Sequence, residues 1–183
     1  MNRLFFLLFL SFFSFTDIKF DGIVEDAEWS DAEEYDLPFE ISPSYNTEAE
    51  HDTLVYIKND STNLYVAFKA LGNRDFIRAG IRARDGINWL DDQVAIGIDT
   101  FGDGRYYIRF SANPLGSIGD NKVDNKDDFD GSYNVEFDAK ARLTNLGYEV
   151  EFVIPFSSLN FPDTNNQKWA LMLSRKLYNK GTE

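Results

Sequence analysis

The chain has 183 residues, of which 43% are hydrophobic and 16% aromatic, and this is enough apolar material for one domain with a sizeable core. Its 18 basic and 31 acidic residues give a net charge of −13, which repels phosphate backbones, so we expect no nucleic-acid partner. The absence of cysteine excludes disulfides, and with a single histidine it leaves no zinc site.

The first segment of the chain is typical of a signal peptide. A polar, basic start at Asn2 and Arg3 precedes an unbroken apolar run over residues 4–10, and small residues mix with phenylalanine after it. The run is shorter than the about 20 residues that a membrane-spanning helix requires, which favours cleavage near Thr16 over a retained anchor. We therefore expect residues 1–16 to be a signal peptide, residues 17–183 to form one domain, and the protein to be exported.

From residue 53 onward, apolar and polar residues alternate in short segments, as is typical of β-strands. Turn-forming residues at 59–63, 102–104 and 144–147 separate these segments. The predicted strands, in chain order, are 53–58, 64–70, 76–82, 94–99, 106–112, 133–143, 148–154 and 169–175. Their spacing predicts an all-β fold, an antiparallel β-sandwich of the jelly-roll kind, with short helical turns only at 26–32 and 156–159.

An acidic, asparagine-rich patch over residues 119–131 interrupts this alternation, and we expect an exposed loop there. Asp120 in this patch, together with Asp99 and Asp103 beside the 102–104 turn, offers the hard oxygen ligands that Ca²⁺ prefers. The spacing is not that of an EF-hand. Two interpretations stay open: a structural calcium ion held by ligands from several loops, or exposed turn residues.

The hairpin predicted over residues 94–112 has a polar, aromatic rim. Trp89, Asp91 and Asp92 precede its first strand, and Asn113 follows its second. An indole stacks on the C–H face of a sugar ring while carboxylates and amides accept hydroxyl hydrogens, so this rim suits a polyhydroxylated ligand. The alternative is that Trp89 closes one end of the sandwich. Trp29 and Trp169 lie in apolar contexts and are expected to pack in the core.

Two pairs of carboxylates are candidates for glycoside hydrolysis, which uses two such groups about 5–9 Å apart. Asp91 and Asp92 are neighbours on a strand and would point to opposite faces. Glu149 and Glu151 share a face, but their alternation with apolar residues is typical of a solvated sheet face. Both patterns favour a non-catalytic domain, and hydrolysis remains the alternative.

Several segments resemble, in order, the motifs of family 9 carbohydrate-binding modules. Residues 21–29 (DGIVEDAEW) are similar to the D-G-x6-W opening of that family, and residues 89–99 (WLDDQVAIGID) resemble its W-x-D-D-x-V-E-I-x-I-D strand. Residues 113–116 (NPLG) and 154–159 (IPFSSL) are closer to the version that precedes a large β-barrel in secreted proteins of Gram-negative bacteria. The resemblance covers residues 20–183.

The resemblance implies a β-sandwich, often calcium-bearing, that holds the end of a glycan between aromatic rings, with Trp89 as one ring. The family's polar contacts are an acid, a basic residue and an amide, at positions that are here Ala95, Ser111 and Asn113. Because two of these groups are missing, affinity for the family's usual ligand should be reduced or redirected. The contacts we expect, besides Trp89 and Asn113, come from Arg84, Asp91 and Asp92.

The resemblance also implies a setting for the domain. We expect a glycan ligand, a role in carbohydrate catabolism as part of a larger protein, and a place outside the cell, in the periplasm or at the outer membrane of a Gram-negative bacterium. The alternative is a domain that binds no sugar and serves as an interaction or plug domain for a C-terminal outer-membrane β-barrel.

Overall fold

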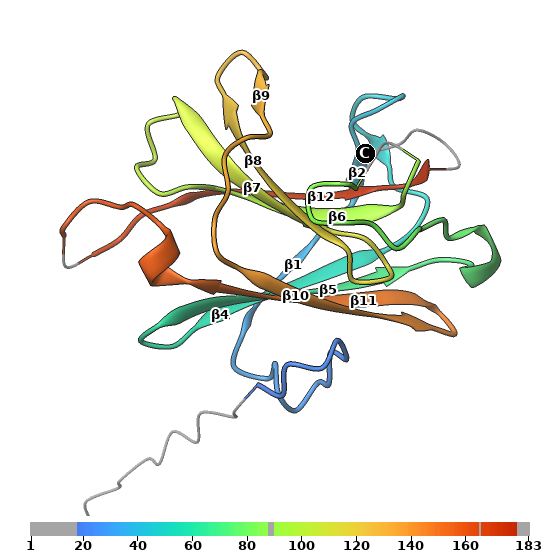
Figure 1. Cartoon of the computed structure of the whole chain (residues 1–183). Helices are drawn as coiled ribbons and strands as arrows, with labels where there is room; N and C mark the ends of the chain where they lie inside the picture. Colours follow the sequence, from blue (N-terminus) through green and yellow to red (C-terminus); the bar gives the residue numbers. More distant parts are fainter. Residues whose placement is uncertain (1–17, 88–89, 165, 179–183) are drawn as a thin grey trace, which may run out of the picture.

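The computed structural model describes residues 18–87, 90–164 and 166–178. These residues form two five-stranded antiparallel sheets packed face to face, and a small ribbon of β2 (Phe39–Glu40) and β3 (Thr47–Glu48) (Figure 1). The predicted antiparallel β-sandwich is confirmed. The predicted signal peptide lies outside the described residues. No helix in the described part of the chain is long and apolar enough to cross a membrane.

The first sheet, the lower layer in Figure 1, is built around two long central strands. Its spatial order is β1 (Glu33–Asp36), β4 (Thr53–Asn59), β5 (Asn63–Leu71), β11 (Gly147–Pro155) and β10 (Asp138–Thr144). Gly147 opens β11 at φ +143°, where an added Cβ would lie 2.0 Å from the carbonyl oxygen of Ala70. Only glycine lets β11 approach β5 this closely.

The second sheet forms the upper layer of Figure 1. Its order is β12 (Ala170–Lys176), β6 (Gln93–Asp99), β7 (Tyr106–Ala112), β8 (Ile118–Asp124) and β9 (Phe129–Asp130). The β6–β7 turn is held by Asp99, whose carboxylate accepts the N–H groups of Phe101, Gly102 and Gly104 at 2.8–3.0 Å. This turn fixes the register that places the polar face of β7 beside that of β6.

The core lies between the two sheets and is rich in aromatic rings. Phe110 and Phe137 meet edge to face with centroids 4.9 Å apart, and Phe68 and Phe152 do the same at 5.9 Å. Each fully buried phenylalanine contributes about 1.5–3 kcal/mol through removal of its surface from water. Burial of this size lets the fold dispense with disulfides, which a chain without cysteine cannot form.

Some segment predictions were wrong. Residues 76–82 are not a strand: Phe76 ends the short 3₁₀ helix η1 (Arg74–Phe76), and residues 77–82 follow it as irregular chain. Residues 119–131 are not simply a loop, since they contain most of β8 and all of β9. The strand predicted over 133–143 begins only at Asp138. The turn predicted at 156–159 is present as η2 (Phe156–Ser158).

The N-terminal segment, residues 18–32, covers the outer face of the first sheet (blue in Figure 1). Trp29 is buried there against Tyr56, which confirms its predicted packing role. The expectation that Glu149 and Glu151 lie on a solvated face was wrong: Glu151 accepts the N–H groups of Asp21 and Gly22, and Glu149 that of Val24. Trp169 is only partly buried and packs against Phe156 and Phe161 at the rim of the core.

Candidate ligand-binding site

A hollow of about 410 Å³ opens on the outer face of the second sheet, between β9 and the chain that leads into β6. We call it the outer-face hollow. The residues that line it are Asp85, Ile87, Gln93, Arg109, Ser111, Gly119, Asp120, Asn121, Phe129 and Gly131. Because Ile96 and Phe110 point into the core, the residues that alternate with them on β6 and β7 face this hollow.

Strand register sets polar side chains over a floor of small residues. Ala95 on β6 pairs with Ser111 on β7, and Ser111 pairs with Gly119 on β8. These small residues keep the floor low. Arg109 pairs with Asn121 in the next row, so a guanidinium and an amide rise side by side next to that floor.

The polar groups of the hollow offer both donors and acceptors. Arg109 Nη2 donates to Gln93 Oε1 at 3.3 Å, which joins β7 to β6 across the hollow. Asn121 Oδ1 is buried and has no hydrogen-bond partner among the described residues. A buried acceptor left unpaired costs about 1–3 kcal/mol, so this oxygen favours a ligand or water that donates to it. A sugar hydroxyl can donate to Asn121 and accept from Arg109 or Gln93 at once.

One wall of the hollow is held to the sheet by backbone contacts. Asp85 N donates to Ile118 O at 3.0 Å, and Asp85 Oδ1 accepts Asp120 N at 2.9 Å, so this chain runs along the edge of β8. Phe129, 57% exposed on β9, stands at another wall and offers an apolar surface. The site therefore combines a fixed polar floor with apolar walls, as small-molecule sites usually do.

No family model matches the chain, and no curated protein matches it. A proposed carbohydrate-binding protein from Bacteroides uniformis superposes with a TM-score of 0.66 at 15% identity, covering 84% of this chain and 75% of that one. A family 9 carbohydrate-binding module from Caldicellulosiruptor kristjanssonii, solved in complex with cellotriose, gives 0.61 at 16% identity, covering 87% and 72%. The chain has the fold of a family 9 carbohydrate-binding module. At these identities the likeness is one of fold.

The predicted platform of this family 9-like fold, Trp89, lies outside the described residues. Along the chain it follows Ile87, which lines the outer-face hollow, by two positions. Its role in stacking stays a prediction.

Asn113, the amide that the family pattern places in contact with the ligand, is fully buried. Its Nδ2 donates to Gly80 O at 2.7 Å, and its Oδ1 accepts the N–H groups of Leu115 and Ser117 at 3.0 Å. The two contacts of Oδ1 shape the turn between β7 and β8, and the contact of Nδ2 ties this turn to the segment before β6. Arg84 donates to Asp120 Oδ1 and to Val135 O. Its guanidinium also lies 4.8 Å from the ring centroid of the core residue Phe137, so Arg84 connects the wall of the hollow to the core.

Asp91 and Asp92 anchor the chain before β6. Asp91 forms a bidentate pair with Arg82, with Nε to Oδ2 at 3.0 Å, and accepts Gly80 N. Burial opposes its ionisation, but the hydrogen bonds from Arg82 and Gly80 outweigh this and hold the pKa of Asp91 below its usual range. Asp92 accepts the N–H groups of Arg78 and Tyr178, and its burial raises its pKa.

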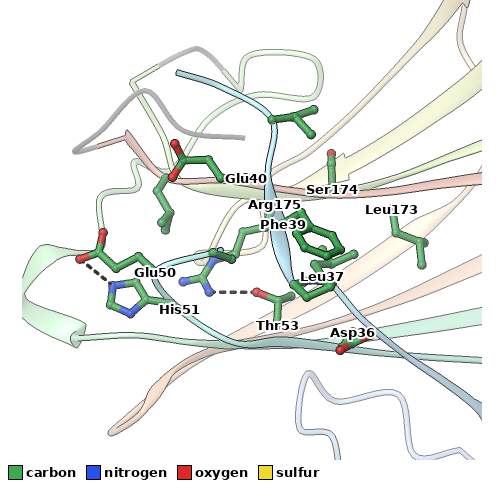
Figure 2. A pocket seen from close by; sticks show the side chains of 14 residues that line it. Asp36, Leu37, Phe39, Glu40, Glu50, His51, Thr53, Leu173, Ser174 and Arg175 are labelled. Atoms are coloured by element: carbon green, nitrogen blue, oxygen red, sulfur yellow. Dashed lines mark hydrogen bonds and ion pairs between the residues drawn. The ribbon is translucent and has the colours of Figure 1, made fainter. Parts of the chain in front are cut away.

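Neither aspartate lines the outer-face hollow. Asp92 lines a different hollow of about 320 Å³ with His51 and Arg175. Figure 2 shows the neighbouring hollow of about 210 Å³, where the Arg175 guanidinium donates to Thr53 Oγ1 at 3.0 Å and His51 lies 3.8 Å from Glu50.

The residues named for calcium do not converge. Asp99 accepts three backbone N–H groups of its own turn, and Asp103 pairs with Arg105 at 2.6 Å. Asp120 accepts hydrogen bonds from the Arg84 guanidinium and from Val135 N. No group of three or more histidine or carboxylate side chains in the described ranges could hold a metal ion. Because N–H donors occupy these carboxylates, the set does not fit a calcium site, and bound calcium stays a prediction without assigned ligands.

The predicted ligand contacts do not include three residues that line the hollow: Gln93, Arg109 and Asn121. The alternation of β6 and β7 contained the signal for the first two, since each lies on the face opposite the core residues. Asn121 gave no such signal, because its segment has the composition of a loop.

Proposed function

We propose that the protein binds the end or a short stretch of a polysaccharide or oligosaccharide, without catalysis, in the outer-face hollow. The observation that carries this proposal is the buried, unpartnered Asn121 Oδ1 beside Arg109 and Gln93, on a floor of small residues. The family 9-like fold supports it, because a protein of that fold has been solved with cellotriose. Secretion and a role in carbohydrate catabolism within a larger protein belong to the same proposal.

Binding would use hydrogen bonds at the floor and apolar contact at the walls. Asn121 accepts a hydroxyl hydrogen, and Arg109 and Gln93 donate to ligand oxygens. Phe129 and Ile87 contact the C–H face of the sugar ring, and Trp89 adds a stacking surface. The basic group lies on β7 at Arg109, two residues before Ser111 and opposite Asn121, so the bound sugar should sit about 7 Å further along β7, toward the β6–β7 turn, than the family pattern implies.

Hydrolysis has less support than binding. The two carboxylates at the hollow, Asp85 and Asp120, both accept backbone N–H groups, and Asp120 also pairs with Arg84. Asp91, Asp92, Glu149 and Glu151 are likewise engaged with backbone N–H groups. General acid and base chemistry needs a carboxyl group that can reach the scissile bond.

Replacement of Asn121 by leucine tests the proposal by calorimetric titration with cellotriose, xylotriose and laminaritriose. At least one of these sugars should bind the unaltered protein. Asn121→Leu removes the acceptor, keeps a branched side chain with the same number of heavy atoms, and should lower affinity about tenfold or more, which corresponds to about 1.4 kcal/mol.

The matched control is Asn125→Leu, the same change at an exposed position of the β8–β9 hairpin that does not line the hollow. Its affinity should stay within about twofold of the unaltered protein. Binding of none of the sugars, or equal affinity of the Asn121 variant, contradicts the proposal.

A further inference from the structure

The carboxylate of Asp85 lines the outer-face hollow and has an oxygen available to a ligand. Its Oδ1 accepts Asp120 N at 2.9 Å, while its Oδ2 accepts no hydrogen bond in the described part of the chain. Both oxygens of the other carboxylate at the hollow, Asp120, are engaged, Oδ1 by Arg84 and Oδ2 by Val135 N. Of these two acids, Asp85 is therefore the one that can contact a ligand.

The backbone holds Asp85 above β8 in an uncommon conformation. Its φ is +62°, in the left-handed region that aspartate and asparagine adopt more readily than other non-glycine residues. Asp85 N donates to Ile118 O at 3.0 Å, and Gly86 N donates to Ala83 O at 2.9 Å. A Cβ added to Gly119 would lie 3.4 Å from Asp85 Cα and 3.5 Å from its Oδ1, so the carboxylate lies above this position of the floor. Residues held in such sparsely populated conformations cluster at ligand sites.

The Asp85 carboxylate shares this face of β8 with the unpaired acceptor Asn121 Oδ1. Gly119, below Asp85, and Asn121 are two residues apart on β8, so they point to the same face about 7 Å apart along the strand. Two acceptors at this spacing need a ligand that supplies hydrogens at neighbouring positions. The hydroxyl groups of a sugar ring supply them, whereas an ionised carboxylate can only accept.

The charges around the hollow give no net attraction to an anion. Among the described residues that line it, Asp85 and Asp120 are acidic and Arg109 is the only cation. Arg84 pairs with Asp120 at 2.5 Å, so Asp85 and Arg109 remain with one charge of each sign. The Arg109 guanidinium lies opposite Asn121 and opposes a metal ion at the oxygens of Asn121 and Asp85. Both observations favour an uncharged ligand.

The position of Asp85 bears on the acid that the family 9 pattern places at Ala95. Ala95, Ser111 and Gly119 form one row across β6, β7 and β8. Since neighbouring strands lie about 4.8 Å apart, the Asp85 carboxylate above Gly119 lies in this row about 10 Å from Ala95. Asp85 can therefore supply an acid to the same site from its wall, two strands away from the family position.

We propose that Asp85 is a specificity-determining residue of the outer-face hollow, which accepts hydroxyl hydrogens from two adjacent hydroxyl groups of an uncharged sugar ring. Its Oδ2 accepts one hydrogen and the remaining lone pair of Oδ1 accepts the other, while Asn121 accepts a third from the same ring. A uronic acid would bring a second carboxylate against Asp85 and bind more weakly. Asp85 acts in this way only if the hollow binds a glycan, so the inference rests on the proposed function.

Asp85→Asn tests the inference by calorimetric titration of the whole chain with the best-binding neutral trisaccharide and with trigalacturonate. Affinity for the neutral sugar should fall about fivefold or more, because hydrogen bonds to a charged acceptor are roughly twice as strong as neutral ones. Trigalacturonate should bind the unaltered protein at least about tenfold more weakly than the neutral sugar. Its affinity should not fall in Asp85→Asn, since this change removes the repulsion between two carboxylates.

Two comparisons separate ligand contact from a structural effect. Asparagine also adopts a positive φ, and its amide oxygen can still accept Asp120 N, so the melting temperature of Asp85→Asn should stay within about 2 °C of the unaltered protein. The matched control is Asp127→Asn, the same change at φ +63° in the exposed β8–β9 turn, away from the lining of the hollow. Its affinity should stay within about twofold of the unaltered protein.

The possible results distinguish this inference from the proposed function. If the unaltered protein binds a neutral trisaccharide and Asp85→Asn binds it equally well, Asp85 is not a contact and the proposed function stands. Equal losses for both ligands, or a loss accompanied by a lower melting temperature, would show that Asp85 acts only through the fold. Tighter binding of trigalacturonate than of the neutral sugars, or binding that EDTA abolishes and calcium restores, also contradicts the inference. Binding of no sugar by the unaltered protein overturns both proposals.

Discussion

At the scale of single residues, Glu151 shows how a polar group in a sheet can be buried without an ion pair. It lies on β11, fully buried, and its Oε2 accepts the N–H groups of Asp21 and Gly22 at 3.0 and 2.7 Å. Burial raises the pKa of Glu151, and these two hydrogen bonds reduce the effect without cancelling it. The carboxyl group therefore holds the N-terminal segment over the sheet, and its ionisation lowers the free energy of unfolding.

The raised pKa of Glu151 predicts a pH dependence of stability. Since the folded state binds this proton more tightly than the unfolded state, ionisation of Glu151 lowers stability as the pH rises above the unfolded-state pKa of about 4.3. Glu151→Gln cannot ionise, so its melting temperature relative to the unaltered protein should rise between about pH 4 and about pH 7. Thermal unfolding followed by circular dichroism measures this difference. A difference that is flat or falls with pH would show that burial does not control this carboxyl group.

At the scale of elements, the close approach of β11 to β5 depends on one glycine. Gly147→Ala would place Cβ 2.0 Å from Ala70 O at a φ of +143° that L-residues rarely adopt, so it should destabilise the fold by at least about 3 kcal/mol. Gly104→Ala is the control: its φ is +69° but nothing lies within 4 Å of the added Cβ, and it should cost about 1–2 kcal/mol. Urea unfolding measures both, and equal losses would contradict the steric argument.

The sequence predicted most of the longer strands. It was wrong where side-chain oxygens, and not a neighbouring strand, accept the backbone N–H groups. β4 to β7 and β11 to β12 each lie within one residue of the predicted bounds. Residues 76–82 also alternate, but their N–H groups are taken by side chains: Arg78 N by Asp92, Gly80 N by Asp91 and Arg82 N by Ser117. Because these partners lie far away in the sequence, the residue pattern of 76–82 alone does not reveal them.

The candidate site was predicted in part for a related reason. Gln93 and Arg109 follow from the alternation of β6 and β7, whereas Asn121 lies in a segment whose acidic composition resembles a loop. Its pairing with Arg109 exists only in the folded sheet. Asn113 was predicted as a ligand contact from its motif, yet its oxygen accepts the N–H groups of Leu115 and Ser117 in the β7–β8 turn and its nitrogen donates to Gly80 O.

At the scale of the whole molecule, the sandwich presents three different surfaces. The outer face of the first sheet is closed by residues 18–32, which bury Trp29 and Glu151. The outer face of the second sheet carries the hollow with Arg109 and Asn121, and the open side of β12 forms a third surface. Because each surface has its own chemistry, glycan binding should perturb one of them and leave the other two unchanged.

A backbone amide chemical-shift map during titration with the best-binding trisaccharide tests glycan binding in the outer-face hollow most directly. We expect the largest shifts on β6, β7 and β8 around Gln93, Arg109 and Asn121, with little change on β12 or over residues 18–32. Shifts concentrated along β12, or none when the sugar is in large excess, would contradict it.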